Sequence, residues 1–270
     1  MEYKLYLKFF SKETKLQAWT YKISEDTTLE KLLENELKKP AYNDITITIL
    51  PGWNIYDIDS ALSDKKYIDA WEFVLAARDH FSDLSVKYPF LKWKTNIEWF
   101  LYPDTYRILP TSDAYMILDK LLSEWQKRIG DSYQSLGDDA YKELILASIV
   151  EREERDKDEQ PVVAGILSKR VKEGIPMWAD ATVCYEYAKT QKQCTPTFIA
   201  SVITEKTPYN TRNKQWYPPT PISTVSLSTW NNVLNKVSSE YYYYLHDSSG
   251  VIHYGKTLEE HNTNKRKYLN

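Results

Sequence analysis

An apolar helix that ends in carboxylates is the feature that most constrains the fold of this chain. Residues 144–153 read Leu-Ile-Leu-Ala-Ser-Ile-Val-Glu-Arg-Glu. The apolar residues recur at helical spacing, so Glu151 continues their stripe while Glu153 turns away from it. An apolar stripe packs against a hydrophobic core. A carboxyl group that faces the core tends to have a raised pKa, because burial disfavours its charged form. A raised pKa suits a general acid near neutral pH. The same letters also fit a helix that ends in a solvated run of charges at residues 151–159.

The remaining elements alternate between predicted helices and short strands. Residues 45–50 alternate and stop at Pro51-Gly52, which predicts a strand. Further strands are expected at residues 3–9, 100–109 and 181–187, and as a hairpin at 241–246 and 251–254. Helices are expected at residues 26–37, 55–62, 68–81, 113–129, 160–173, 197–203 and from about 257, with a loop at 130–139. This mixture predicts an α+β fold.

Composition excludes several classes of protein. Hydrophobic residues make up 42% and charged residues 27%, as in an ordinary soluble domain, and a net charge of −3 gives no field that favours nucleic acid. No apolar run approaches the roughly 18 residues of a transmembrane helix, and charges interrupt residues 1–10, so no signal peptide is expected. The two cysteines, Cys184 and Cys194, lack metal-site spacing and fit either one disulfide or two free thiols.

Several short motifs follow one another in a fixed order around this helix. They are residues 98–106 (Glu-Trp-Phe-Leu-Tyr-Pro-Asp-Thr-Tyr), 161–167, 174–177, 180–183 (Asp-Ala-Thr-Val), 207–211 (Thr-Pro-Tyr-Asn-Thr), 218–222 (Pro-Pro-Thr-Pro-Ile) and 256–262 (Lys-Thr-Leu-Glu-Glu-His-Asn). In this order and at these spacings they resemble the MltG (YceG-like) family of endolytic peptidoglycan transglycosylases. The resemblance covers about residues 45–268.

The resemblance implies a domain plan and an activity. An N-terminal region, residues 1–110, would hold a LysM-like subdomain at about 45–110, and residues 111–270 would form the YceG-like α+β catalytic domain. The enzyme would be a lytic transglycosylase, a lyase that cuts the MurNAc–GlcNAc β-1,4 bond of nascent strands and leaves 1,6-anhydro-MurNAc. It would need no cofactor or metal.

The resemblance also implies a place in the cell. The partners would be peptidoglycan glycan strands and cell-wall synthases, on the extracytoplasmic side of the bacterial cytoplasmic membrane. Members of the family carry one N-terminal membrane anchor. The resemblance therefore leads us to expect either that the anchor was removed from this chain or that the protein does without it.

One glutamate carries the implied chemistry. Glu151 matches the family's catalytic residue, which protonates the glycosidic oxygen and then acts as a base on the sugar's own 6-hydroxyl. Glu153 matches another motif position and is the second candidate, with a surface charge as its alternative. The resemblance assigns substrate binding to Glu153, Asp180, Thr182, Tyr209, Asn210, Thr211 and Glu98. Asp180 and Asn210 could equally cap local turns, and Glu98 could tie two domains together. We expect Glu151, Asp180, Tyr209 and Asn210 to converge on one groove.

Glycine is scarce and tryptophan is frequent, with 7 and 9 of 270 residues. Trp99 and Trp216 stand where the family pattern has glycine, and Trp93 and Trp178 are also suspect. One hypothesis is that the source reads UGA as glycine and the gene was translated with tryptophan. It predicts exposed indoles, positive φ or crowding at Trp99 and Trp216. The other hypothesis is genuine tryptophan in a protein that stacks indoles on sugars.

Two departures from the family pattern favour other functions. Residues 169–171 are Lys-Arg-Val where the family has Asn-Arg-Leu, and residues 224–226 are Thr-Val-Ser where it has Asn-Pro-Gly. A catalytically impaired glycan-binding or scaffold protein of the cell envelope is therefore the alternative. Ordinary hydrolysis would need a second carboxylate, Glu153 or Asp180, several ångströms from Glu151 to hold a water.

Overall fold

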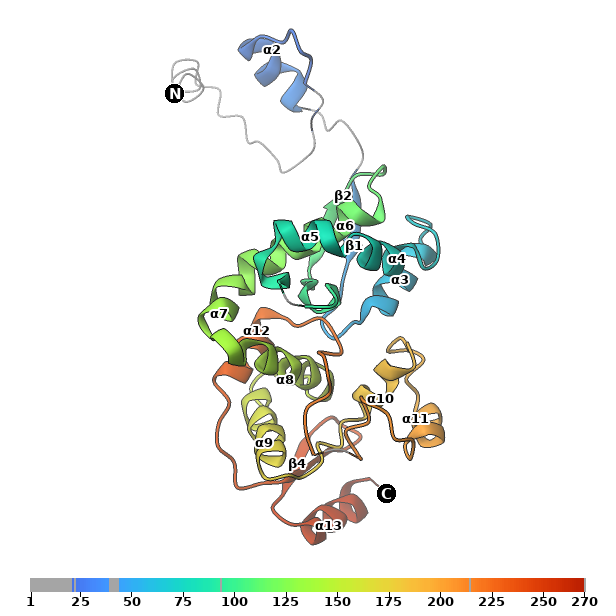
Figure 1. Ribbon diagram of the computed structural model, residues 1–270, viewed down its shortest axis with the longest axis vertical. Coiled ribbons are helices and arrows are strands. Elements are labelled where there is room, and N and C mark those ends of the chain that lie inside the picture. Colours follow the sequence, from blue (N-terminus) through green and yellow to red (C-terminus); the bar gives the residue numbers. More distant parts are fainter. Residues whose placement is uncertain (1–20, 22, 39–43, 93, 214, 270) are drawn as a thin grey trace. The chain divides into compact units, whose positions relative to one another are not determined.

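The computed structural model describes residues 21, 23–38, 44–92, 94–213 and 215–269, so the strand expected at residues 3–9 lies outside the described part (Figure 1). The chain forms two compact units. One combines the residues up to Thr48 with Thr105–Asp113, and the other combines Ile49–Asp104 with Ala114–Asn270. These units are not the two domains expected from the sequence, and the domain boundary expected near residue 110 remains a prediction.

The described residues of the first unit form one α-helix, a short 3₁₀ turn and one two-stranded sheet. Helix α2 (Leu29–Glu34) begins at Thr28, whose side chain accepts a hydrogen bond from the backbone N–H of Lys31, and a short 3₁₀ turn, η1 (Glu36–Lys38), follows it. Strands β1 (Ile45–Thr48) and β2 (Thr105–Ile108) pair antiparallel. The expected strand at residues 100–109 is confirmed only in its second half, where β2 lies. Pro103 has no N–H to donate to a neighbouring strand, which disfavours a strand in the first half.

The second unit is mostly helical. Its helices are α3 (Ile55–Asp64), α4 (Glu72–Asp79), α5 (Phe81–Lys87), α6 (Ala114–Trp125), α7 (Asp131–Ser135), α8 (Ala140–Glu153), α9 (Gln160–Lys172), α10 (Asp180–Glu186), α11 (Pro196–Val202), α12 (Leu227–Leu234) and α13 (Leu258–Tyr268). Short turns of other helix types are η2 (Pro89–Leu91), η3 (Glu98–Phe100), η4 (Gln126–Gly130) and η5 (Gly137–Asp139). Strands β3 (Tyr243–His246) and β4 (Ile252–Gly255) form the expected hairpin. Mixed helices and sheets agree with the α+β expectation, while the LysM-like subdomain remains a prediction.

Two expected elements are wrong. Residues 181–187 were expected as a strand, but α10 covers Asp180–Glu186. Its residues from Ala181 to Cys184 are all buried, and a continuous apolar run does not distinguish a strand from a buried helix. The loop expected at residues 130–139 contains α7.

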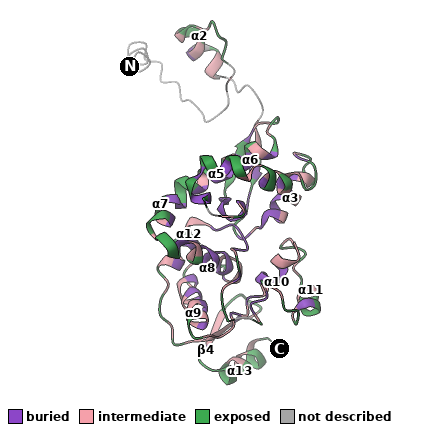
Figure 2. Ribbon diagram, viewed as in Figure 1, coloured by how far each residue is buried: buried purple, intermediate pink, exposed green. Residues whose placement is uncertain are grey.

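Helix α8 forms the centre of the second unit's core (Figure 2). Every residue from Leu144 to Val150 is buried, and α8 packs against both α9 and α12. The segment after α12 crosses α9 so closely that a Cβ on Gly165 would lie 1.9 Å from the carbonyl oxygen of Val237, so only glycine fits there. In the described part of the chain, no helix has the length and apolar content to cross a membrane.

Candidate functional site

Glu151 is held by a lysine and by the start of α12. Its side chain is 3% exposed, and Nζ of Lys157 lies 2.8 Å from Oε1. The backbone N–H and the hydroxyl of Ser226, the residue that caps α12, donate to Oε2 at 2.8 and 2.7 Å. A carboxylate is favoured at a helix N-terminus because the helix dipole is positive there. Glu151 therefore ties the end of α8 to the start of α12.

Glu153 lies on another side of the same helix end, at the wall of a cavity of about 410 Å³. The hydroxyl of Tyr244, on β3, donates to its Oε2 at 3.0 Å. Burial raises the pKa of Glu153 to about 7, helped by the nearby charge of Asp180 and opposed by the Tyr244 hydrogen bond and by Arg152. A carboxyl group with this pKa keeps a large protonated fraction at neutral pH, which a general acid requires.

The cavity is lined from α8, α9, α13, strand β3, the loop before α10 and the loop after α11. Apart from Glu153, its lining residues are Arg170, Trp178, Arg212, Tyr244, Leu245, Leu258, His261 and Lys265. Asp180, the first residue of α10, reaches this region through Arg212, whose Nη2 lies 2.6 Å from Asp180 Oδ1. Among the described residues that line the cavity, Glu153 is the one carboxylate.

Three of the expected sugar-binding residues are engaged inside the protein. The hydroxyl of Thr182 donates to the carbonyl of Ala179 at 2.7 Å and lies 3.1 Å from that of Thr211. The amide of Asn210 donates to the carbonyls of Ile203 and Glu205 at 2.9 and 2.7 Å. All three side chains are buried, so they hold together the loops that position Asp180. Direct contact between these side chains and a sugar stays a prediction.

Glu98 forms the centre of a second polar cluster. Its carboxyl accepts the N–H of Ile55 at 3.0 Å and the hydroxyl of Tyr185 at 2.7 Å. Burial raises the pKa of Glu98 to about 7. The ring of Tyr209 packs 5.0 Å from that of Tyr185, and its hydroxyl bonds Thr220 at 2.6 Å. Glu98 and Tyr209 therefore join the start of α3 to α10.

The expected convergence of four residues on one groove stays a prediction. None of the four lines the cavity beside Glu153: Glu151, Asp180, Tyr209 and Asn210. Asp180 is connected to it through its partner Arg212, which is a lining residue.

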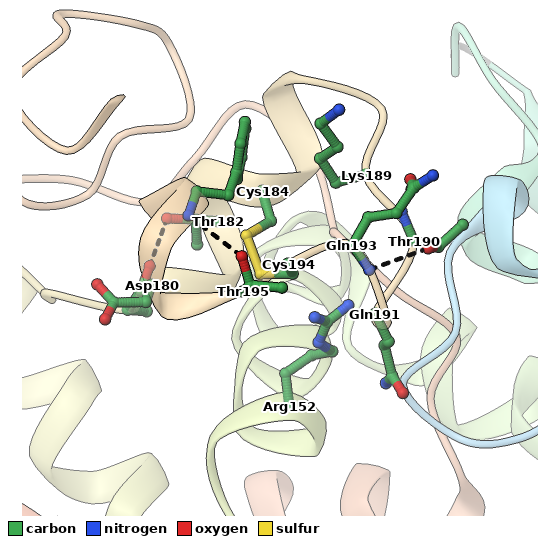
Figure 3. The surroundings of a disulfide bond; sticks show 12 residues. Arg152, Asp180, Thr182, Cys184, Lys189, Thr190, Gln191, Gln193, Cys194 and Thr195 are labelled. Atoms are coloured by element: carbon green, nitrogen blue, oxygen red, sulfur yellow. Dashed lines mark hydrogen bonds between the residues drawn. A yellow bond between two sulfur atoms is a disulfide. The ribbon is translucent and has the colours of Figure 1, made fainter. Parts of the chain in front are cut away.

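A disulfide fixes the loop that follows α10. Cys184 and Cys194 are bonded, with their Cα atoms 5.6 Å apart. The closed loop docks on the first turn of α3 and on the segment before it: the N–H of Gln191 donates to Asp57 at 2.7 Å, and the Gln191 side chain donates to the carbonyl of Gly52 at 3.0 Å. Figure 3 shows the disulfide beside this loop, with Arg152 of α8 close by. The disulfide alternative left open by the sequence is confirmed.

The structure tests whether these tryptophans occupy positions that suit glycine. Trp99 is 2% exposed, and its indole N–H donates to Tyr185 at 3.3 Å, so the expectation that it fits badly is wrong. Trp216 is 59% exposed, as expected. Trp178 has a φ of 57° and Trp71 a φ of 70°, which are backbone conformations that favour glycine. No feature of the sequence alone singled out Trp71, and Trp93 lies outside the described residues.

The two departures from the family pattern have local structural roles. Nζ of Lys169 donates to the carbonyl of Ser239 at 3.0 Å and lies 3.5 Å from the ring centroid of Tyr242. The N–H of Thr224 donates to the carbonyl of Trp53 at 2.7 Å, and Ser226 caps α12. Lys169 therefore attaches the loop at Ser239 to α9, and Ser226 stabilises the start of α12.

The chain is similar over nearly its whole length to proteins already described. It is 25% identical to an endolytic murein transglycosylase of Bacillus subtilis over 94% of this chain and 73% of the relative. It is 23% identical to one of Streptococcus pneumoniae over 95% of this chain, which spans about half, 51%, of that relative.

Fold and family comparisons agree with this similarity. The crystal structure of a YceG-like protein from Listeria monocytogenes superposes with a TM-score of 0.70 at 22% identity, over 97% of this chain and 89% of that one. The sequence model of the YceG-like family matches residues 1–267. The chain belongs to the YceG-like family.

Proposed function

We propose that this protein is an endolytic murein transglycosylase whose general acid is Glu153. The observation that carries this proposal is a single carboxyl group, with a pKa raised to about 7, in the wall of a cavity. A lytic mechanism needs only one such group, whereas most glycosidases place two carboxylates across the bond. The names of the Bacillus and Streptococcus relatives support the same activity.

The reaction uses one carboxyl group twice, first as an acid and then as a base. Glu153 donates its proton to the glycosidic oxygen between MurNAc and GlcNAc as the bond from that oxygen to C1 of MurNAc breaks. The 6-hydroxyl of the same MurNAc then bonds to C1, and its proton passes to the Glu153 carboxylate. The products are a 1,6-anhydro-MurNAc end and a free GlcNAc 4-hydroxyl, and no water is consumed.

Helix geometry and contacts favour Glu153 over Glu151 for this role. Two residues along an α-helix are about 200° apart around its axis, so the two side chains serve different surroundings. Both oxygens of Glu151 already accept hydrogen bonds from Lys157 and Ser226. Among the described residues, Tyr244 is the one hydrogen-bond donor to Glu153, and Glu153 borders the cavity. Glu151 remains the second candidate.

The finer assignments rest on the same geometry for the residues near the cavity, and on the family resemblance for the subdomain and the partners. Asp180, with Arg212, would shape the edge of the cavity, while Thr182, Asn210 and Thr211 would hold the loop behind it. A LysM-like subdomain would bind glycan, and cell-wall synthases would be partners. The disulfide between Cys184 and Cys194 supports an oxidising compartment, and therefore the extracytoplasmic side of the membrane.

Digestion of purified peptidoglycan tests the proposal. Mass spectrometry of the wild-type products should find ends that are one water lighter than reducing ends. Glu153→Gln should lower the cleavage rate by about 10²–10⁴-fold, because it removes the transferable proton and keeps the size. Glu151→Gln is the matched control and should retain most of the rate.

The outcomes separate the candidates. Near-normal cleavage by the Glu153→Gln protein, together with a collapse in folded Glu151→Gln, would return the acid role to Glu151. Glycan binding without any cleavage by the wild type would favour the scaffold alternative. Reducing ends in place of anhydro ends would indicate hydrolysis.

A further inference from the structure

The cavity beside Glu153 carries an excess of basic side chains. Arg170, Arg212, His261 and Lys265 line it, against one carboxylate, Glu153. Arg212 is already paired with Asp180, but the others leave the cavity suited to an anion.

Arg170 is the buried member of this set. It is 4% exposed, and its Nη1 donates to the carbonyl of Met177 at 2.6 Å. Its guanidinium lies 4.9 Å from the ring centroid of Trp178 and 5.3 Å from that of Tyr243, so stacking fixes its plane. Among the described residues, none accepts a hydrogen bond from its buried Nε. A buried donor without a hydrogen-bond partner destabilises the folded protein. A ligand that accepts this hydrogen bond would remove that destabilisation.

His261, on α13, also packs against Tyr243 and repeats this pattern. Its ring stacks 5.2 Å from the ring of Tyr243. Its buried Nδ1 also finds no hydrogen-bond partner in the described part of the chain. Burial lowers the pKa of His261, with the charges of Lys265 and Arg170 acting in the same direction. Two polar groups with unmade hydrogen bonds therefore belong to residues that line one cavity.

We propose that Arg170 and His261 form a carboxylate subsite that recognises the muramoyl residue of the bond whose oxygen Glu153 protonates. This inference rests on the proposed function. A guanidinium binds a carboxylate with strong, directional hydrogen bonds, and MurNAc differs from GlcNAc by a lactyl group that carries a carboxylate or a stem peptide with carboxylates. The subsite selects the anionic sugar of the strand and orients its C1 toward Glu153.

Binding of small muramoyl ligands to the intact protein tests the subsite without any cleavage. The probes are MurNAc with its free lactyl carboxylate, MurNAc-dipeptide with free carboxylates, and the same dipeptide with every carboxylate amidated. Calorimetry should find the wild type binding one acid form about tenfold more tightly than the amidated form. Tighter binding of plain MurNAc identifies the lactyl carboxylate, and tighter binding of the dipeptide identifies the stem peptide.

Two variants connect the preference to the residues. Arg170→Gln and His261→Phe should each reduce the preference for the acid form, and His261→Phe keeps the ring that stacks on Tyr243. Arg170→Lys is the matched control and should keep part of it, because the charge remains. If the Arg170→Gln protein does not fold, the binding preference of the His261→Phe protein still tests the subsite.

Equal binding of acid and amide by the wild type, or an unchanged preference in the folded variants, would overturn the subsite. A preserved preference in a wild type that cleaves no peptidoglycan would instead overturn the proposed function and leave the subsite standing.

Discussion

Replacing Trp71 by glycine should not weaken the protein, although it deletes a whole indole. Trp71 precedes α4 with φ 70° and ψ −4°, and its side chain makes no capping hydrogen bond. A residue with a Cβ pays about 1–2 kcal/mol in this left-handed region, and glycine does not. The indole is 56% exposed and meets Tyr56 edge-on at 6.1 Å, a contact worth about 0.5 kcal/mol.

The comparison with alanine isolates the backbone strain. Trp71→Ala also removes the indole but keeps the Cβ, so it should be less stable than Trp71→Gly by about 1 kcal/mol. At an ordinary backbone position the order is the reverse, because glycine loses about 0.5–1 kcal/mol more chain entropy than alanine. Trp216 is the matched control: it is exposed and has no positive φ, so its alanine variant should be the more stable one.

Thermal melts followed by circular dichroism measure these differences. For a domain of this size, 1 kcal/mol moves the melting temperature by about 2–4 °C. Equal melting of the two Trp71 variants, or alanine above glycine as at Trp216, would refute the strain. The gene is a second check: the UGA hypothesis requires UGA at codons 99 and 216 and fails if UGG stands there. The positive φ of Trp71 and Trp178 extends the same requirement to codons 71 and 178.

Three further outcomes are expected. The raised pKa of Glu98, about 7 against an ordinary 4.5, means that its folding contribution is fully present below pH 4.5 and lost as the pH rises through 7. The Glu98→Gln protein should therefore gain about 3 kcal/mol relative to wild type from pH 4.5 to 8 in urea titrations, and a constant difference would contradict this. Reducing the disulfide of Cys184 should cost about 2–3 kcal/mol and expose its loop to trypsin; unchanged digestion would count against that constraint. Ser226→Ala should lower stability by about 1 kcal/mol through the lost cap of α12 without slowing cleavage, and a large loss of rate would favour Glu151 as the acid.

Local sequence signals predicted the elements that local physics decides. The periodicity of residues 144–153 predicted α8, and Thr257 caps α13 as its sequence indicates, accepting the N–H of Glu260 at 3.1 Å. The hairpin of β3 and β4 was also found from alternation and its turn. These signals lie within a few residues of the element that they define.

The roles of the two glutamates could not be predicted in this way. Glu153 owes its hydrogen bond to Tyr244, which is 91 residues away in sequence. Glu151 owes its bonds to Ser226, 75 residues away. Which carboxyl group borders the cavity depends on where β3 and α12 dock, and no local pattern records that docking. The strain at Trp71 could not be predicted either. Its left-handed backbone precedes α4, and the usual sequence signal for such a backbone is a glycine, which is absent at position 71.

The departures from the family pattern bear on loops rather than on the acid. Lys169 does not line the cavity of Glu153; it holds Ser239 and Tyr242 against α9. Ser226 acts on Glu151. Neither change therefore removes a group that the proposed reaction uses, which favours the enzyme over the scaffold.

Restoring the family's asparagine at Lys169 tests this conclusion. Lys169→Asn loses the ammonium contact with Tyr242 and the bond to Ser239, so the protein should lose about 1–2 kcal/mol of stability in urea titrations. Its cleavage rate, measured well below its unfolding midpoint, should stay within about threefold of wild type, since a change of 0.6 kcal/mol or less in the barrier is all that such a distant contact would transmit. A rise of ten-fold or more would mean that the amide belongs to the catalytic machinery and that lysine impairs it.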